Sequence, residues 1–207
     1  MRTRYWTLLV ASCVWLSGCV TPPKKDLSAF TSAAPRSVLV VPVVNKSLDV
    51  DAQNYVLTTL PVPVAEKGYY VFPINTSKFV LEQEGYYEPE RVHQMSPQEL
   101  AKLFDADAVL YVTINRWDAQ YVVLSTTVTV EFDYRIVGRD GATLWTDRQR
   151  LVYSPNNSQG GLIGAMVNAA IARAAPNYMP LTRQANGQAF YGHGAIPDGP
   201  YKATAKK

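Results

Sequence analysis

The sequence predicts an α/β (α+β) domain on a mixed β-sheet, with a long antiparallel hairpin and helices mainly on one face. A continuous β-branched run at 37–44 is followed by a helical stretch and a second short apolar segment, the order of a parallel β-α-β unit. Two later segments, 121–137 and 142–153, alternate apolar and polar residues with the period of a half-exposed strand. Residues 138–141, GRDG, are typical of a hairpin turn between them.

The chain opens with a leader. Arg2 and Arg4 precede an apolar stretch over 5–16, shorter than the roughly 20 apolar residues that a bilayer span needs, so the segment predicts a signal peptide. It ends in LSGC at 16–19, which resembles the lipobox of bacterial lipoproteins. We expect cleavage before Cys19 and lipidation of its thiol, and an ordinary secretory leader is the alternative.

Cleavage and lipidation at Cys19 predict the membrane and the compartment in which the protein is located. More than one acyl chain on Cys19 would give a stable anchor, since each buried methylene contributes about 0.8 kcal/mol. Val20 follows the cysteine where an inner-membrane retention signal has Asp, so we expect the outer membrane, with the domain in the periplasm and surface display as the alternative. Cys13 is removed with the leader, which leaves no thiol for disulfides or cysteine-bound zinc.

Composition divides the chain into four parts. We expect a signal peptide over 1–18, a lipidated tether over 19–36, the α/β periplasmic domain over 37–176 and an irregular C-terminal arm over 177–207. The tether is rich in Pro, Ser and Ala, and the arm carries Gly and Pro with little periodicity.

The first elements form the parallel unit. Pro42 indicates that the strand within 37–44 either ends there or lies at the edge of the sheet. The helical region 51–67 is interrupted at Pro61 and Pro63, which predicts two short helices or one kinked helix. A short strand at 69–72 follows.

Two further helices lead into the strands of the hairpin. One is expected over 76–84, before a loop at 86–89. The next has a clear start, because Ser96, Pro97 and Glu99 are a hydroxyl cap, a first-position proline and the partner of a capping box. Its end at Asp105 leads into three long strands, predicted at 108–117, 121–137 and 142–153.

The central strand has two chemically different sides. One side is apolar: Val128, Val130, Phe132, Tyr134 and Ile136. The other is polar: Thr127, Thr129, Glu131, Asp133 and Arg135. A last helix, rich in alanine and glycine and suited to close packing on a sheet, is predicted over 160–175.

The order of these segments resembles a neisserial-type family of bacterial lipoproteins of unknown function. The resemblance rests on the lipobox, VLVVPVVNKS, VPVAEKGYYVFP, FDADAVLYVTI, the hairpin and the alanine helix. It implies a fold like the TolB N-terminal domain, related to the periplasmic parts of CsgG, PelC and LpoB, and by analogy a protein-binding role in the envelope. The charged hairpin differs from the membrane-inserted hairpins of CsgG-like channels, so we expect no pore.

Composition and motifs argue against several functions. Of 20 basic side chains, two lie in the leader, so 18 face 17 acidic ones, and no basic patch favours nucleic acid. His93 and His193 are far apart and read as surface residues, and no Gly-x-Ser-x-Gly elbow occurs. The glycines at 160, 161 and 164 suit a helix start better than a phosphate loop. We therefore expect neither an enzyme nor a cofactor.

The remaining expectation is a binding role. Four aromatic residues, Tyr86, Tyr87, Trp117 and Tyr121, are candidates for an interface, with core packing as the alternative. We expect a non-enzymatic accessory or assembly lipoprotein that contacts the membrane through Cys19, binds envelope proteins and forms a homo-oligomer. One alternative is a regulator of a periplasmic enzyme such as a peptidoglycan synthase, and the other is a small-molecule or glycan-binding lipoprotein.

Overall fold

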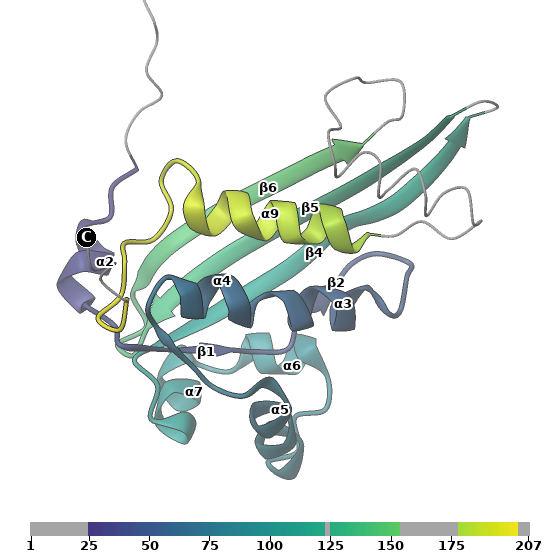
Figure 1. The fold of residues 1–207 in the computed structure, drawn as a ribbon. Coiled ribbons are helices and arrows are strands. Elements are labelled where there is room, and N and C mark those ends of the chain that lie inside the picture. Colours follow the sequence, from purple (N-terminus) through teal and green to yellow (C-terminus); the bar gives the residue numbers. More distant parts are fainter. Residues whose placement is uncertain (1–24, 123–124, 154–177, 203–207) are drawn as a thin grey trace, which may run out of the picture.

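The structure is a computed structural model that describes residues 25–122, 125–153 and 178–202. Its centre is a mixed sheet in the order β3-β1-β4-β5-β6, with β2 paired beside β1 on β4 (Figure 1). The strands are β1 (Ser37–Val40), β2 (Val44–Asn45), β3 (Tyr70–Val71), β4 (Ala108–Val122), β5 (Ser125–Gly138) and β6 (Thr143–Tyr153). Pairs among β1, β2, β3 and β4 are parallel, whereas β4, β5 and β6 are antiparallel. The predicted fold class is confirmed.

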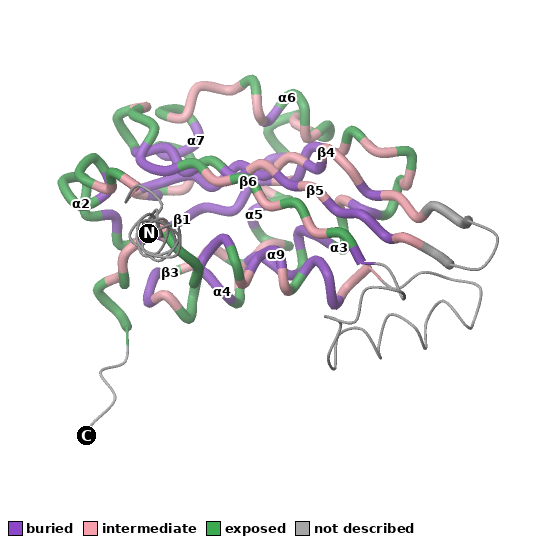
Figure 2. Tube along the Cα trace, turned by 90° about the horizontal axis from the view of Figure 1, so that it is seen from above, coloured by how far each residue is buried: buried purple, intermediate pink, exposed green. Residues whose placement is uncertain are grey.

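The helices cover the two faces of the sheet unequally (Figure 2). The larger apolar cluster lies between the sheet and α2 (Ser28–Ala33), α3 (Ala52–Thr59), α4 (Pro61–Glu66) and α9 (Met179–Tyr191). A smaller cluster on the other face involves α5 (Ile74–Gln83), α6 (Pro89–Gln94) and α7 (Pro97–Phe104), near β1 and the start of β4. We call the first side the covered face.

Beyond α5, α6 and α7, the second side of β4, β5 and β6 carries polar side chains, and we call it the polar face. The alternation predicted for β5 is confirmed, because Phe132 and Tyr134 are buried on the covered face while Asp133 and Arg135 are not buried. Thr129 is the exception, since it is only 6% exposed although it belongs to the polar set.

The local signals for helix ends are also confirmed. Pro61 stands in the first turn of α4, which separates α3 from α4 as expected. At the start of α7, Ser96 Oγ accepts a hydrogen bond from the Glu99 amide at 3.1 Å, and the Glu99 carboxylate accepts one from the Ser96 amide at 3.3 Å. This is the predicted capping box.

One predicted strand boundary within the described residues was wrong, and one helix was not predicted. The break expected at 118–120 does not occur, because β4 continues to Val122 and pairs with β5 up to Ser125. Ladder pairing outweighs the low strand propensity of Asp, Ala and Gln there. The loop predicted at 86–89 is observed over 86–88, and a helix that was not predicted, α6, begins at Pro89, where proline occupies the first helical position.

The expected irregular arm and tether are also partly helical. α9 lies within 177–207 and buries Leu181, Ala185 and Ala189, whose spacing of four residues forms one helical face. α2 lies within 19–36 and buries Phe30. Packing on the sheet therefore overrides the weak helical propensity of both segments. No described helix is long and apolar enough to cross a bilayer.

Candidate functional site

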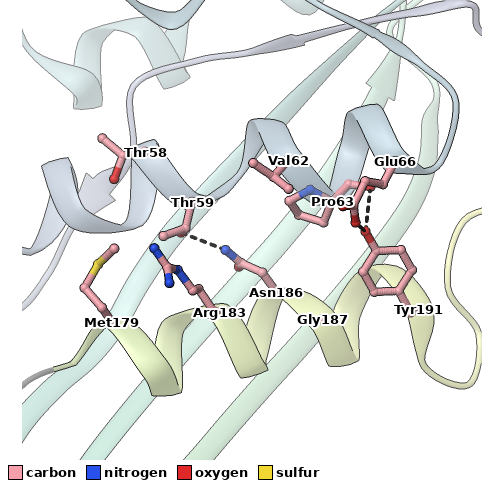
Figure 3. A pocket seen from close by; sticks show the side chains of 10 residues that line it. All are labelled: Thr58, Thr59, Val62, Pro63, Glu66, Met179, Arg183, Asn186, Gly187 and Tyr191. Carbon is pink, nitrogen blue, oxygen red and sulfur yellow. Dashed lines mark hydrogen bonds between the residues drawn. The ribbon is translucent and has the colours of Figure 1, made fainter. Parts of the chain in front are cut away.

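A groove of about 480 Å³ lies between the α3–α4 pair and α9 (Figure 3). The two walls come from segments far apart in the sequence, since Thr59 and Asn186 are separated by 127 positions. The lining residues are Thr58, Thr59, Val62, Pro63, Glu66, Met179, Arg183, Asn186, Gly187 and Tyr191.

A buried polar chain forms the floor of this groove. The Tyr134 hydroxyl donates to Asn186 Oδ1 at 2.8 Å, and Asn186 Nδ2 donates to Thr59 Oγ1 at 2.8 Å. The Thr59 hydroxyl in turn donates to the Val56 carbonyl at 2.7 Å. Burial raises the pKa of Tyr134 well above its usual value, so this hydroxyl stays protonated and remains a donor. The chain links β5, α9 and α3 and holds the groove in a fixed shape.

The two ends of the groove carry opposite charge. At one end the Tyr191 hydroxyl donates to the Glu66 carboxylate, and burial together with this bond raises the pKa of Tyr191 above its usual range. At the other end Arg183 lies beside Met179, is exposed, and forms no ion pair within the described part of the chain (Figure 3). The Val62 side chain, 58% exposed, lies between them.

These groups are suited to binding. The lining offers a cation, a carboxylate, hydroxyls and apolar carbon. Over residues 25–122, 125–153 and 178–202, no three His, Cys, Asp or Glu side chains are grouped to hold a metal ion.

A second cavity of about 560 Å³ lies on the polar face. There Arg148 Nη2 donates to Asp133 Oδ2 at 2.9 Å, and this pairing holds the pKa of Asp133 below its usual value. The Arg135 guanidinium lies 4.6 Å from the Tyr111 ring centre. His93 is half-buried rather than fully exposed, and its Nε2 lies 3.0 Å from the Pro42 carbonyl oxygen. Burial lowers the pKa of the His93 imidazole.

The structure does not bring the predicted interface residues into one patch. Tyr86 and Tyr87 follow α5, and the Tyr87 side chain is 70% exposed. Trp117 is only 4% exposed on the covered face, where it stacks on Tyr178 at 4.4 Å and donates to Asp49 at 3.1 Å. Trp117 is thus a core residue, because its bulk fills the space under α3 and α9. The Tyr121 side chain lies outside the described residues.

The signal peptide, Cys19, and the helix predicted over 160–175 also lie outside the described residues. The groove residues were not identified from the sequence. They lie partly in 177–207, the predicted irregular arm, where only the apolar period of Leu181, Ala185 and Ala189 indicates a helix.

A family of bacterial lipoproteins and one of its curated members match most of this chain. The profile of the family described as "Putative lipoprotein GNA1162-like" matches residues 25–191. A putative lipoprotein of Neisseria meningitidis serogroup B is 33% identical over 200 residues, which is 92% of this chain and 93% of that protein.

Solved structures resemble the fold. The crystal structure of lipoprotein GNA1162 from Neisseria meningitidis has a TM-score of 0.58 at 35% identity and covers 68% of this chain and 98% of that one. The PelC dodecamer from Paraburkholderia phytofirmans scores 0.44 at 16% identity, over 78% of this chain and 95% of that one. The LpoB C-terminal domain from Salmonella enterica scores 0.41 at 19% identity, over 60% and 91%.

Proposed function

Because this chain belongs to the GNA1162-like family of lipoproteins, we propose that it is a non-enzymatic accessory or assembly factor that binds cell-envelope proteins. Lipid anchoring is the property of the family. The finer parts of the proposal are acylation at Cys19, the outer membrane as the anchoring membrane, which Val20 supports, and a periplasmic position of the domain.

The observation that carries the protein-binding role is the groove between α4 and α9. Its middle is apolar and exposed at Val62, and Arg183 and Glu66 lie at opposite ends. A partner segment with one apolar side chain between an acidic and a basic residue would match both the shape and the charges. Such complementarity gives orientation and specificity, while the apolar centre contributes most of the affinity.

Two alternatives share this site. A partner that is itself an enzyme would make the protein a regulator of a periplasmic enzyme such as a peptidoglycan synthase. A small-molecule or glycan ligand is favoured by one observation, the groove volume of about 480 Å³, which lies in the range of small-ligand pockets of about 300–1,000 Å³.

Photo-cross-linking in cells tests the proposal with a matched pair of sites. A benzophenone amino acid replaces either Val62 in the groove or Phe79 on α5, whose side chains are 58% and 59% exposed. We expect a discrete cross-linked envelope protein from position 62 and none from position 79. Equal products from both positions, or none from 62, would contradict binding of a protein in the groove.

A blocking variant removes the remaining ambiguity. A Cβ added at Gly187 meets no atom within 4 Å, so a side chain can begin there without a clash, and Gly187→Leu adds apolar bulk to the groove. In a helix it should even favour folding by about 0.5–1 kcal/mol relative to glycine. The position-62 product should disappear in Gly187→Leu, and its persistence would place the contact elsewhere. Mass spectrometry of the product distinguishes an enzyme from an assembly component.

A further inference from the structure

The folded domain begins nearer to Cys19 than residue 37, the start predicted from the sequence. Lys25 Nζ lies 3.0 Å from Asp147 Oδ1 and 5.0 Å from the Trp145 ring centre, so this lysine is fixed to the edge strand β6. Three residues later α2 begins, and Phe30 is 2% exposed with its ring packed edge-on to Tyr69 at 6.0 Å. The expected tether is therefore docked on the domain from Lys25 onward.

Only a short piece of chain separates this docked point from the anchor. Five residues lie between Cys19 and Lys25 in the sequence. Six residue steps of about 3.3–3.6 Å span at most roughly 20 Å even when fully extended. An acylated Cys19 lies at the membrane interface, so the Lys25 backbone lies within that distance of it.

We infer that the end of the domain formed by α2 and residues 192–202 faces the lipid headgroups of the anchoring membrane. This rests on the proposed function only through acylation of Cys19. The hairpin of β4 and β5 then extends away from the lipid, and its 15-residue first strand is about 50 Å long.

The position of the chain ends agrees with this orientation. Figures 1 and 2 show α2 and the C-terminal end of the described chain at the same end of the molecule, away from the tip of the hairpin. The two described segments also touch, because a Cβ on Gly194 would meet the Lys25 side chain at 3.0 Å. Lys206 and Lys207 follow Lys202 in the sequence.

The chemistry of this end suits a headgroup layer. The exposed residues of α2 are small: Ser28, Ala29, Thr31, Ser32 and Ala33. The Arg36 guanidinium donates to the Tyr201 hydroxyl at 3.0 Å and forms no ion pair within the described residues. Tyr201 is 56% exposed, and tyrosine is enriched at membrane–water interfaces.

Acidic groups at this end are partly neutralised. Asp147 pairs with Lys25, and Asp198 pairs with Lys67 at 2.7 Å. Asp26 remains exposed, and its carboxylate accepts a hydrogen bond from the Ser28 amide at 2.9 Å. Among the described cations at this end, Lys25, Lys67 and Lys202 are paired and Arg36 is not, so the surface is close to neutral, which suits zwitterionic and weakly anionic lipids.

Site-specific quenching tests the orientation. After removal of the leader, Cys19 is the only cysteine, so an added cysteine provides one thiol for a fluorophore. Ser32→Cys on α2 and Leu48→Cys are compared in the acylated protein in phosphatidylcholine vesicles with a headgroup-linked spin label. Leu48 is fully exposed in the loop between β2 and α3, and Figure 1 shows these two elements away from α2. We expect several-fold stronger quenching from position 32 than from position 48.

A length variant controls for the short connection. Inserting twenty Gly and Ser residues between Thr21 and Pro22 lengthens the maximum reach by about 70 Å and should remove most of the difference between the two positions. Equal quenching at 32 and 48 in the native-length protein would overturn the orientation. The mass of the N-terminal peptide separates the two proposals, because an unmodified Cys19 overturns the anchor as well, whereas an acylated Cys19 with equal quenching overturns the orientation alone.

Discussion

The covered and polar faces of the sheet are built from alternate residues of the same strands, yet they have different physical roles. On β5, Phe132 is completely buried against Trp117 and Tyr134, whereas the side chain of its neighbour Asp133 is 36% exposed and pairs with Arg148. Burial of large apolar groups contributes far more to stability than an ion pair in contact with water. The comparison teaches that, along β5, the residues of the covered face contribute far more to stability than those of the polar face.

The strongest way to break this comparison is to remove bulk from the covered face. Phe132→Ala should destabilise the domain by about 3–5 kcal/mol, because it loses buried aromatic surface and leaves a cavity. The measurement is urea unfolding of the mature domain without its leader. Asp133→Ala, one position along, is the control and should cost below about 1 kcal/mol. Similar losses in both variants would refute the division of roles.

The polar chain below the groove sharpens the comparison, because it is polar but lies on the covered face. Tyr134→Phe should cost about 1–3 kcal/mol, since it leaves Asn186 Oδ1 buried without its donor. In a double-mutant cycle with Asn186→Ala, a coupling of about 0.5–3 kcal/mol is expected from urea unfolding. Gln188→Ala, exposed on the same helix, should remain within about 0.5 kcal/mol of the wild type. Additive effects at Tyr134 and Asn186 would show that the bonds are not energetically linked.

Where sequence reasoning succeeded, the signal was local. The capping box at Ser96 and Glu99 lies within four residues, and the alternation on β5 is a property of one strand. Each signal is read without knowing what packs against it. The β-α-β order is likewise local, because it depends on consecutive segments.

Where it failed, the determining contact was distant. α9 is weakly marked because Asn186 and Gly187 lower its propensity, and it forms against β5 and β6. From the sequence Trp117 suits either an interface or the core, and the stacking of Tyr178 on it, from 61 positions away, is what the sequence does not indicate. The groove shares this origin, since its walls meet only after the sheet has assembled. Long-range packing therefore decides the features that matter most for binding.

The smallest effect concerns the ion pair of the polar face, and pH reveals it. Hydrogen bonding to Arg148 lowers the pKa of Asp133 in the folded protein below its usual value of 3.8. The charged carboxylate thus stabilises the fold above about pH 4, and this contribution is lost as pH falls through the lowered folded-state pKa. At pH 7 the free energy of unfolding of Asp133→Asn should be lower than that of the wild type, by less than about 1 kcal/mol because the ion pair is exposed to water.

Urea unfolding of both proteins at pH 7, 5 and 3 measures this difference, which should be unchanged at pH 5 and smaller at pH 3. Arg148→Gln is the matched control, because it removes the other partner and should show the same dependence. A difference that persists in full at pH 3 would mean that the substitution acts through the Asn115 amide, which donates to Asp133 Oδ2 at 2.7 Å, rather than through the charge. The hydrogen bonds of Asp133, rather than its charge, would then stabilise the polar face. A binding partner that replaced Arg148 with its own charged group would in that case also disturb β4, which carries Asn115.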